Sequence, residues 1–462
     1  MKKNIYAVIA VLLALSSCSQ EGPAGAGPAG EGSRIYFRSY LPTVSQTRAG
    51  VITNENLNEC HVTSFNPDDN KLIDPETGEM TPYFINRHFE KDGEGHFLPQ
   101  GEESCLWPDS RSRLHFFAYS PSVESMQESI AGEKFNTVNN SKQAEDGTSV
   151  FDYRIESFKV APDISDQVDF ITAYSHGTGQ DNGDSGINLN FSHQLARVEI
   201  SAWGASEKYD FEIAGVRIGN AVTEGDFCFS SLIPSSGVAS WVKTEDKPAP
   251  IEHIFNDGES IVFISKENAL HATEADAASI MGSAGTAMVI PMAEKIEAWE
   301  GKGDPKTEQL PYSTDKLYFS VLLRVTNRGE ATVVYPYPND RDNMKTIHLA
   351  IGEDGKVIKR VYLIGEEYYT SDQENEENKY IPNETEEIRS YCWAALPVGA
   401  KWDAGKIYTY KLNYTTGIGW QDPDDPNPGE PIIERGKIPF EVNVEEWVAA
   451  EDYNPNLDVP KR

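Results

Sequence analysis

Few side chains in this sequence have the spacing that catalysis requires. The tetrapeptide Gly183-Asp184-Ser185-Gly186 has the form of a nucleophilic serine loop, in which a histidine from another part of the chain activates the serine. The nearest upstream histidine, His176, lies only nine residues before Ser185 and in no recognisable catalytic motif. We therefore interpret the tetrapeptide as a Gly/Asp turn between strands, and we expect a protein that is not an enzyme.

Three acidic clusters contain side chains that bind metals in other proteins. The first consists of His88, Glu90, Asp92, Glu94 and His96; the second of Asp422, Asp424 and Asp425; the third of Asp68, Asp69 and Asn70. Neither histidine belongs to an HExxH pattern, and the second cluster has prolines around it but no closing Glu at EF-hand spacing. We interpret the first as a solvated acidic turn, the second as part of an acidic loop and the third as a generic polar segment, and we expect no metal and no cofactor other than a covalent lipid.

One cysteine near the N-terminus predicts that covalent lipid. Lys2 and Lys3 precede an apolar run from Ile5 to Leu15, which is too short to span a bilayer and is typical of a signal peptide. The sequence Leu15-Ser16-Ser17-Cys18 resembles the lipobox of bacterial lipoproteins. That resemblance implies that residues 1–17 are removed and that Cys18 receives diacylglycerol and an N-acyl chain such as palmitate. Several acyl chains anchor a protein stably, so we expect attachment to the outer membrane.

The other four cysteines lie far apart, at Cys60, Cys105, Cys228 and Cys392. They form no CxxC pair, and a structural zinc site would need closer spacing. We expect buried free thiols, and a Cys60–Cys105 disulfide is the alternative.

The composition predicts a soluble body carried on a tether. The formal charge of the 462 residues is −33, which becomes −35 when Lys2 and Lys3 leave with the signal peptide. Such a charge disfavours nucleic acid as a partner. Residues 18–33 include a Gly/Ala/Pro-rich stretch from Glu21 to Ser33 without apolar periodicity. As a flexible tether, these 13 residues would span about 20 Å.

Short segments rich in aromatic and β-branched residues predict an all-β fold. The candidate strands are Ile35 to Leu41, Leu114 to Tyr119, Val168 to Ala173, Ile187 to Gln194, Leu195 to Trp203, Phe211 to Ile218, Ile261 to Ile264, Ala287 to Ile290, Leu317 to Val325, Val357 to Leu363, Ile407 to Tyr414 and Ile438 to Trp447. Only Glu267 to Met281 has the composition of a helix. Because the pattern changes near residues 205–208, we expect two antiparallel β-sandwiches in tandem, at residues 49–207 and 208–462.

Five groups of residues occur in one order along the mature chain. They are Thr47-Arg48-Ala49 after the first strand; Leu106-Trp107-Pro108 with Leu114-His115-Phe116-Phe117-Ala118-Tyr119; Val168-Asp169-Phe170-Ile171 with Asn190-Phe191-Ser192-His193; Ile213-Ala214-Gly215-Val216 with Ala287-Met288-Val289-Ile290-Pro291; and Ala404-Gly405-Lys406-Ile407-Tyr408 ahead of Phe440-Glu441-Val442-Asn443-Val444-Glu445-Glu446-Trp447. Together they resemble the fimbrillin family, the subunits of type V pili in Gram-negative anaerobes. The resemblance implies two transthyretin-like β-sandwiches and assembly by strand exchange. In that family, an Arg- or Lys-specific protease removes the first strand, and a neighbour's C-terminal strand fills the opened groove.

The residues at the start of the mature chain suit that scheme. Ile35, Phe37 and Leu41 would fill the groove of the precursor, within a propeptide strand at residues 34–48. The Arg48–Ala49 bond lies just downstream in a polar segment that a protease can reach.

The residues at the C-terminal end have the pattern of a donor strand. Within residues 438–447, Ile438, Phe440, Val442 and Val444 share one face at a period of two. We expect the partners to be other fimbrial subunits, the outer membrane through the lipid, and a host or bacterial receptor.

Three alternatives remain at this point. Arg34 and Arg38 compete with Arg48 as cleavage sites, and residues 438–447 equally suit an ordinary last strand of their own domain. The alternative function is a stand-alone surface lipoprotein that binds a glycan or a host protein. Its aromatic platform would come from Trp299, Trp402 and Trp420.

Overall fold

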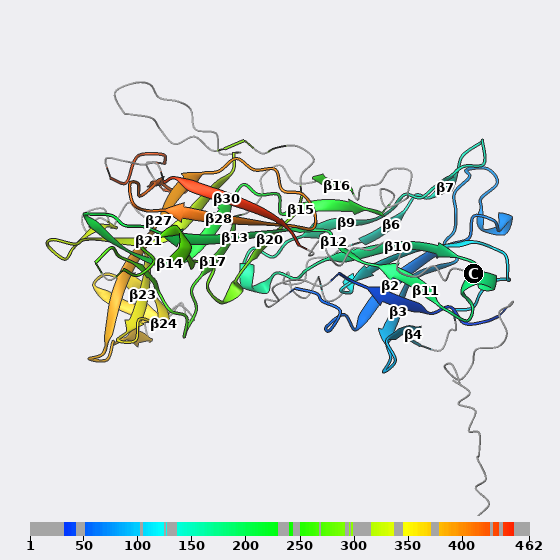
Figure 1. The fold of residues 1–462 in the computed structure, drawn as a ribbon, viewed down its shortest axis with the longest axis horizontal. Helices are drawn as coiled ribbons and strands as arrows, with labels where there is room; N and C mark the ends of the chain where they lie inside the picture. Colours follow the sequence, from blue (N-terminus) through cyan, green and yellow to red (C-terminus); the bar gives the residue numbers. More distant parts are fainter. Residues whose placement is uncertain are drawn as a thin grey trace, which may run out of the picture.

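The fold is an elongated body with two lobes arranged along its long axis (Figure 1). The computed structural model describes residues 32–42, 51–101, 105–123, 126, 136–229, 240–243, 250–267, 269–291, 295, 297–298, 316–336, 345–370, 378–425, 428–433 and 438–447. Nearly all regular structure in these ranges is β-strand, in several largely antiparallel sheets, so the predicted all-β class is confirmed. No helix of the described residues is long and apolar enough to cross a membrane.

The N-terminal lobe is built on an eight-stranded sheet in the order β11-β1-β4-β3-β2-β5-β10-β12. Its strands are β1 (Phe37–Tyr40), β2 (Glu59–Phe65), β3 (Phe84–Lys91), β4 (His96–Pro99), β5 (Leu114–Ser120), β10 (Ile171–Gly177), β11 (Ile187–Asn190) and β12 (Ser192–His193). β1 and β11 pair in parallel, and the other ladders of this sheet are antiparallel.

A four-stranded sheet in the order β16-β15-β9-β6 packs against one face of this eight-stranded sheet. Its strands are β6 (Asn136–Asn139), β9 (Tyr153–Lys159), β15 (Glu224–Cys228) and β16 (Ser240–Lys243), and β7 (Lys142–Gln143) and β8 (Ser149–Val150) form a separate hairpin. Aromatic rings fill the layer between the sheets: the Phe117 and Tyr153 centroids lie 6.3 Å apart, and those of Phe170 and Phe227 lie 5.1 Å apart. The two sheets therefore share one apolar core.

A second core lies on the other face of the eight-stranded sheet. It gathers side chains from β1, β11 and β4 with others from β2, β3 and β5, and Trp107 closes it with 2% of its surface exposed. The first strand of the described chain is thus part of a core rather than an appendage.

The C-terminal lobe also consists of two facing sheets. The smaller contains β13 (Ala196–Trp203), β19 (Ala278–Ser279), β20 (Ala287–Val289), β28 (Lys406–Asn413) and β30 (Phe440–Glu446). The larger contains β14 (Tyr209–Gly219), β17 (Ile251–Ile254), β18 (Val262–Ile264), β21 (Tyr318–Asn327), β22 (Thr332–Tyr335), β23 (Ile347–Gly352), β24 (Val357–Ile364), β25 (Glu367–Thr370), β26 (Lys379–Tyr380), β27 (Glu386–Pro397) and β29 (Trp420–Gln421). They meet through contacts such as Phe319 on Tyr410, whose centroids lie 4.8 Å apart.

Strand pairing crosses the boundary that the sequence suggests at residues 207/208. β13 precedes that point but forms a seven-residue parallel ladder with β28 of the C-terminal lobe. β15 follows it but pairs with β9 of the N-terminal lobe. The chain therefore passes between the lobes more than once. Such exchanges depend on contacts between distant residues, which a change in local pattern cannot show.

The helix expected at Glu267 to Met281 is absent from the described part of that range. The segment instead contains the 3-10 turn η4 (Glu274–Asp276) and the short strand β19, which pairs with β13. Ile280 and Met281 are fully buried, so tertiary packing outweighs the helical propensity of the Ala/Glu-rich sequence. Further helical turns that lie wholly within the described residues are η1 (Asn70–Leu72), η2 (Ile164–Asp166), α2 (Gly179–Asn182) and η5 (Gly282–Ala284).

Candidate functional site

β1 is inserted between two strands of the N-terminal lobe. Phe37 lies opposite Ile187 of β11 on one side and opposite Phe97 of β4 on the other. Ile35, Phe37 and Leu41 each have 0% of their surface exposed, although the first and last lie just outside the strand. The three apolar side chains that the sequence singled out therefore occupy one groove.

Phe37 is the central side chain of that groove. Its ring makes edge contacts with Phe89, at a centroid distance of 4.8 Å, and with Phe116, at 5.2 Å. Edge-to-face pairs of this kind add about 0.5–1.5 kcal/mol to the free energy gained from burial alone. The groove is therefore a shaped aromatic pocket, in which a smaller side chain would leave a cavity.

Polar contacts hold both ends of the β1 segment. The Ile35 amide donates to the Cys105 carbonyl at 2.7 Å. At the other end, the Leu41 amide donates to Asn54 Oδ1 at 3.0 Å, and Asn54 Nδ2 donates to the Leu41 carbonyl. The side chain of Asn54 thus mimics one more strand partner. No periodic pattern in the sequence indicates this residue, because it lies in a polar turn.

The Gly183–Gly186 turn also supports β1. The Tyr36 hydroxyl donates to the Asp184 carbonyl at 2.6 Å, and burial raises the pKa of this phenol. Gly186 has φ = +72°, and a Cβ there would lie 2.6 Å from the Tyr36 ring. Ser185 donates to the Asp181 carbonyl at 3.3 Å. The tetrapeptide is a turn that fits against Tyr36.

His176 lies beside another histidine, His115. Its ring lies 5.9 Å from that of His115, and burial lowers the pKa of both histidines, that of His115 to about 4. Together with the turn geometry of Ser185, these contacts give the tetrapeptide and its histidine a structural explanation.

β30 lies at the edge of its sheet, whereas β1 lies between two strands of its own sheet. In the described structure its ladder neighbour is β28, with which it forms seven antiparallel pairs from Lys406↔Glu446 to Leu412↔Phe440. In Figure 1 it runs along β28 with its later end near the middle of the molecule. Among the described strands, none pairs with its outer edge.

The apolar face of β30 is only partly covered. Val442 lies opposite Tyr410, and Val444 lies opposite Tyr408, whose side chains point into the core. Val442 is nevertheless 43% exposed and Val444 49% exposed. Ile438 and Trp447, which flank the strand, have 2% and 0% exposed. The strand is therefore held at its ends, and its middle lies over the rim of the core.

The predicted modification sites fall outside the described residues. Cys18, Arg48 and Ala49 are among them, so the lipid and cleavage predictions stay predictions. The described chain resumes at Val51, which is 97% buried (3% exposed). The competing arginines, Arg34 and Arg38, are exposed but lie in β-bridges: Arg34 with Leu106, and Arg38 within β1.

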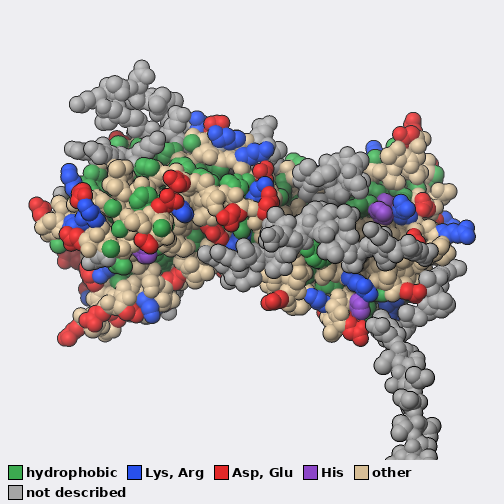
Figure 2. All heavy atoms as spheres, viewed as in Figure 1, with side chains coloured by type: hydrophobic (Ala, Val, Ile, Leu, Met, Phe, Trp, Pro, Cys, Tyr) green, Lys and Arg blue, Asp and Glu red, His purple; other side chains and the backbone are tan. Residues whose placement is uncertain are grey.

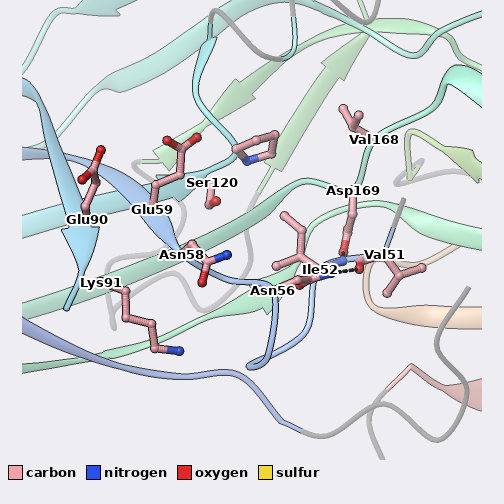
Figure 3. A pocket seen from close by; sticks show the side chains of 11 residues that line it. Val51, Ile52, Asn56, Asn58, Glu59, Glu90, Lys91, Ser120, Val168 and Asp169 are labelled. Carbon is pink, nitrogen blue, oxygen red and sulfur yellow. Dashed lines mark hydrogen bonds between the residues drawn. The ribbon is translucent and has the colours of Figure 1, made fainter. Parts of the chain in front are cut away.

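A pocket of about 570 Å³ lies beside Val51 and Ile52, where the described chain resumes (Figure 3). Three of its polar lining side chains have partners within the protein. Asp169 Oδ2 accepts from the Ile52 amide at 3.0 Å, Glu59 Oε2 lies 3.1 Å from His88 Nε2, and Lys91 Nζ donates to the Asn54 carbonyl at 2.9 Å.

The cluster at Asp422 and Asp424 is paired with an arginine. Within the described residues no group of three or more metal-binding side chains has the geometry to hold an ion. Arg217 Nη1 lies 3.2 Å from Asp422 Oδ1 and 3.4 Å from Asp424 Oδ2, so a guanidinium neutralises these carboxylates. On the face shown in Figure 2, acidic side chains are scattered over both lobes and interspersed with Lys and Arg.

The cysteines confirm the expectation of buried thiols, and Trp402 contradicts the expectation of an exposed aromatic platform. All four mature cysteines other than Cys18 are buried free thiols, as predicted, and burial raises the pKa of Cys392 to about 12. Trp402 is only 2% exposed and donates from Nε1 to the Tyr410 hydroxyl at 3.0 Å. It therefore cannot serve as a surface platform. Trp420 is half-buried in β29, and Trp299 lies outside the described residues.

Solved structures and a family model match most of this chain. A fimbrial protein from Bacteroides vulgatus is 13% identical; the match covers 90% of this chain and 100% of that chain with a TM-score of 0.47. A proposed cell adhesion protein from Parabacteroides distasonis is 10% identical, with 92% and 99% covered and a TM-score of 0.36. The sequence matches no curated protein. The model of the fimbrillin-like family matches residues 47–447, so this chain belongs to the fimbrillin-like family.

Proposed function

We propose that this chain is a non-enzymatic structural or adhesive subunit of a surface fimbria that accepts a strand from another subunit. The position of β1 is the observation that carries the proposal. β1 is hydrogen-bonded to a strand on each side. Its covalent connection to the rest of the lobe runs through residues 41–51, so one cut in that segment would separate the two. Removing it would leave one groove with backbone groups open on both walls, which is the arrangement that strand addition requires.

The proposed route to the surface begins with the lipid. Residues 1–17 direct export, Cys18 is acylated, and residues 18–33 separate the folded lobes from the outer membrane. An Arg-specific protease then cuts the Arg48–Ala49 bond. The cut frees the lipid, the tether and β1 together, so the lipid serves as a delivery device.

The energetics favour replacement of β1 over an empty groove. Burial of Ile35, Phe37 and Leu41 contributes roughly 5–9 kcal/mol, at about 1.5–3 kcal/mol for each side chain. Loss of β1 would expose the aromatic rings that Phe37 covers, chiefly Phe89 and Phe116. A strand from a second subunit with apolar residues at alternate positions would restore this burial.

The strand proposed to be donated is β30. Phe440, Val442 and Val444 alternate along it, and the two valines are already substantially exposed. An edge strand can leave its sheet by breaking one ladder, whereas a central strand must break two. Ile438 and Trp447 would have to leave buried positions at the same time.

The test is protease-dependent assembly of the full chain in detergent. After an Arg-specific protease has removed residues 1–48, we expect ladders that resist mild denaturant on a gel. The matched control is Arg48→Gln, which should stay uncut and monomeric. A wild-type chain that loses residues 1–48 and yet stays monomeric would overturn the proposal.

A further inference from the structure

Trp447, the last described residue, is the most tightly enclosed part of the β30 segment. Its indole has 0% of its surface exposed, directly after six strand residues that are all exposed. Its amide donates to the Gly405 carbonyl at 2.8 Å. The hydrophobic anchor is therefore at the end of this strand, and Figure 1 shows that the later end of β30 lies near the middle of the molecule.

The indole is enclosed by side chains from two different sheets. The His193 ring stacks on it at a centroid distance of 4.1 Å and an interplanar angle of 4°. Arg197, which is itself fully buried, places its guanidinium 5.2 Å from the centre of the indole. His193 belongs to β12 of the N-terminal lobe, and Arg197 belongs to β13 of the C-terminal lobe. The end of β30 is thus held where the two lobes meet.

A buried carboxylate holds the stacking histidine. His193 Nδ1 lies 2.7 Å from Asp169 Oδ2, and both side chains are fully enclosed. Asp169 also accepts from the amides of Ile52 and Phe170, at 3.0 Å and 2.8 Å. Figure 3 shows Asp169 beside Ile52, at the wall of the pocket. The histidine ring is therefore positioned by a network that includes the backbone four residues beyond Arg48.

We propose that Trp447 is a latch that holds β30 within its own subunit, with His193 and Asp169 as its positioning residues. The inference rests on the proposed strand exchange and adds to it the step that controls release. Because Val442 and Val444 contribute little burial, the indole stack provides most of the side-chain anchorage at this end of the strand. Release of the strand therefore requires the indole to leave the junction between the lobes.

The experiment measures amide hydrogen exchange in the β30 peptide of the full, uncut chain. Trp447→Ala should raise exchange across residues 440–446 by roughly 100-fold, because the deleted side chain is a large buried one. Trp447→Phe should keep most of the protection, since it retains a ring that can stack on His193. Trp420→Ala is the matched control, because it removes a half-buried tryptophan from an edge strand of the other sheet.

Two further variants separate the latch from general loss of structure. His193→Ala and Asp169→Asn leave the indole in place but remove its support, and each should raise β30 exchange at least several-fold with peptides of β21 unchanged. If β30 exchange in Trp447→Ala and in His193→Ala equals that of the Trp420→Ala control, the latch is wrong. If Trp447→Ala also raises amide exchange in β21, that variant has lost structure generally. The His193→Ala variant then decides whether the latch exists, by whether β30 exchange rises while β21 exchange stays unchanged.

The latch and the proposed function can fail separately. If Trp447→Ala raises β30 exchange but no ladders form after protease treatment, the latch is supported and strand exchange is wrong. Protease-dependent ladders that form equally fast in Trp447→Ala and wild type, with equal β30 exchange, would keep strand exchange and overturn the latch.

Discussion

The two strands nearest the ends of the described chain differ in how they are held. β1 has neighbours on both sides, and Ile35, Phe37 and Leu41 are fully buried. β30 has one ladder neighbour among the described strands, and Val442 and Val444 are exposed. The sequences of both strands alternate in the same way, so alternation alone does not distinguish a strand that fills a core from one at its rim.

This contrast shows where the free energy of each strand resides. In the β1 segment it resides along the whole length, in Ile35, Phe37 and Leu41, with Phe37 packed on two other phenylalanines. In β30 it resides at the flanks, in Ile438 and Trp447. A groove that is filled along its length suits an acceptor, and a strand with a loosely held middle suits a donor. The predictions below test this difference, from the largest effect to the smallest.

Truncation of one apolar side chain in each strand should separate the two strands most clearly. Phe37→Ala should lower the free energy of unfolding by about 3–5 kcal/mol, because it leaves a cavity between aromatic rings. Val442→Ala should lower it by less than about 1 kcal/mol, because nearly half of that side chain is already in water. Urea unfolding of the full chain measures both, and equal losses would remove the distinction.

The side-chain clamp on β1 should have the next largest effect. Asn54→Ala removes the two hydrogen bonds to Leu41 and leaves a backbone amide without its acceptor, which should cost about 1–3 kcal/mol. Amide exchange of the β1 peptide should rise, and that of β30 should not change. Asn188→Ala, at an exposed position of neighbouring β11, is the control. Unchanged β1 exchange would show that the clamp is dispensable.

The hydroxyl of Tyr36 should matter less. Tyr36→Phe deletes the hydrogen bond to Asp184 and keeps the ring against Gly186, so a loss of about 0.5–1.5 kcal/mol is expected. Gly186→Ala should cost more than that, since it introduces a Cβ at a positive φ and against the ring. If the glycine variant is the milder one in thermal unfolding, the proposed fit between the turn and β1 is wrong.

The ion pair at the end of β30 should have the smallest effect. Lys406 Nζ lies 2.8 Å from Glu446 Oε1, but both side chains are substantially exposed and screened by water. Glu446→Gln should therefore change stability by less than about 0.5 kcal/mol and leave β30 exchange near the wild-type rate. A large rise in exchange would mean that this surface contact, and not Trp447, holds the strand.

The sequence revealed the strands better than it revealed their surroundings. Alternating apolar residues identified both β1 and β30, because burial on one face leaves a period of two. The clamp at Asn54 and the stack of His193 on Trp447 join residues far apart in the chain, and no local pattern encodes them. The exchange of β13 and β15 between lobes was missed for the same reason. The helix expected near residue 274 failed because buried Ile280 and Met281 outweigh propensity.

The central claim is that a strand from a second subunit enters the groove left by β1. The most direct measurement is a disulfide trap between two full-length variants: Asn188→Cys, exposed on the groove wall at β11, and Asn443→Cys, on the outward face of β30. The account predicts a mixed disulfide dimer after Arg-specific cleavage and none with the uncut Arg48→Gln background. Chains that have lost residues 1–48 but form no mixed dimer would contradict it.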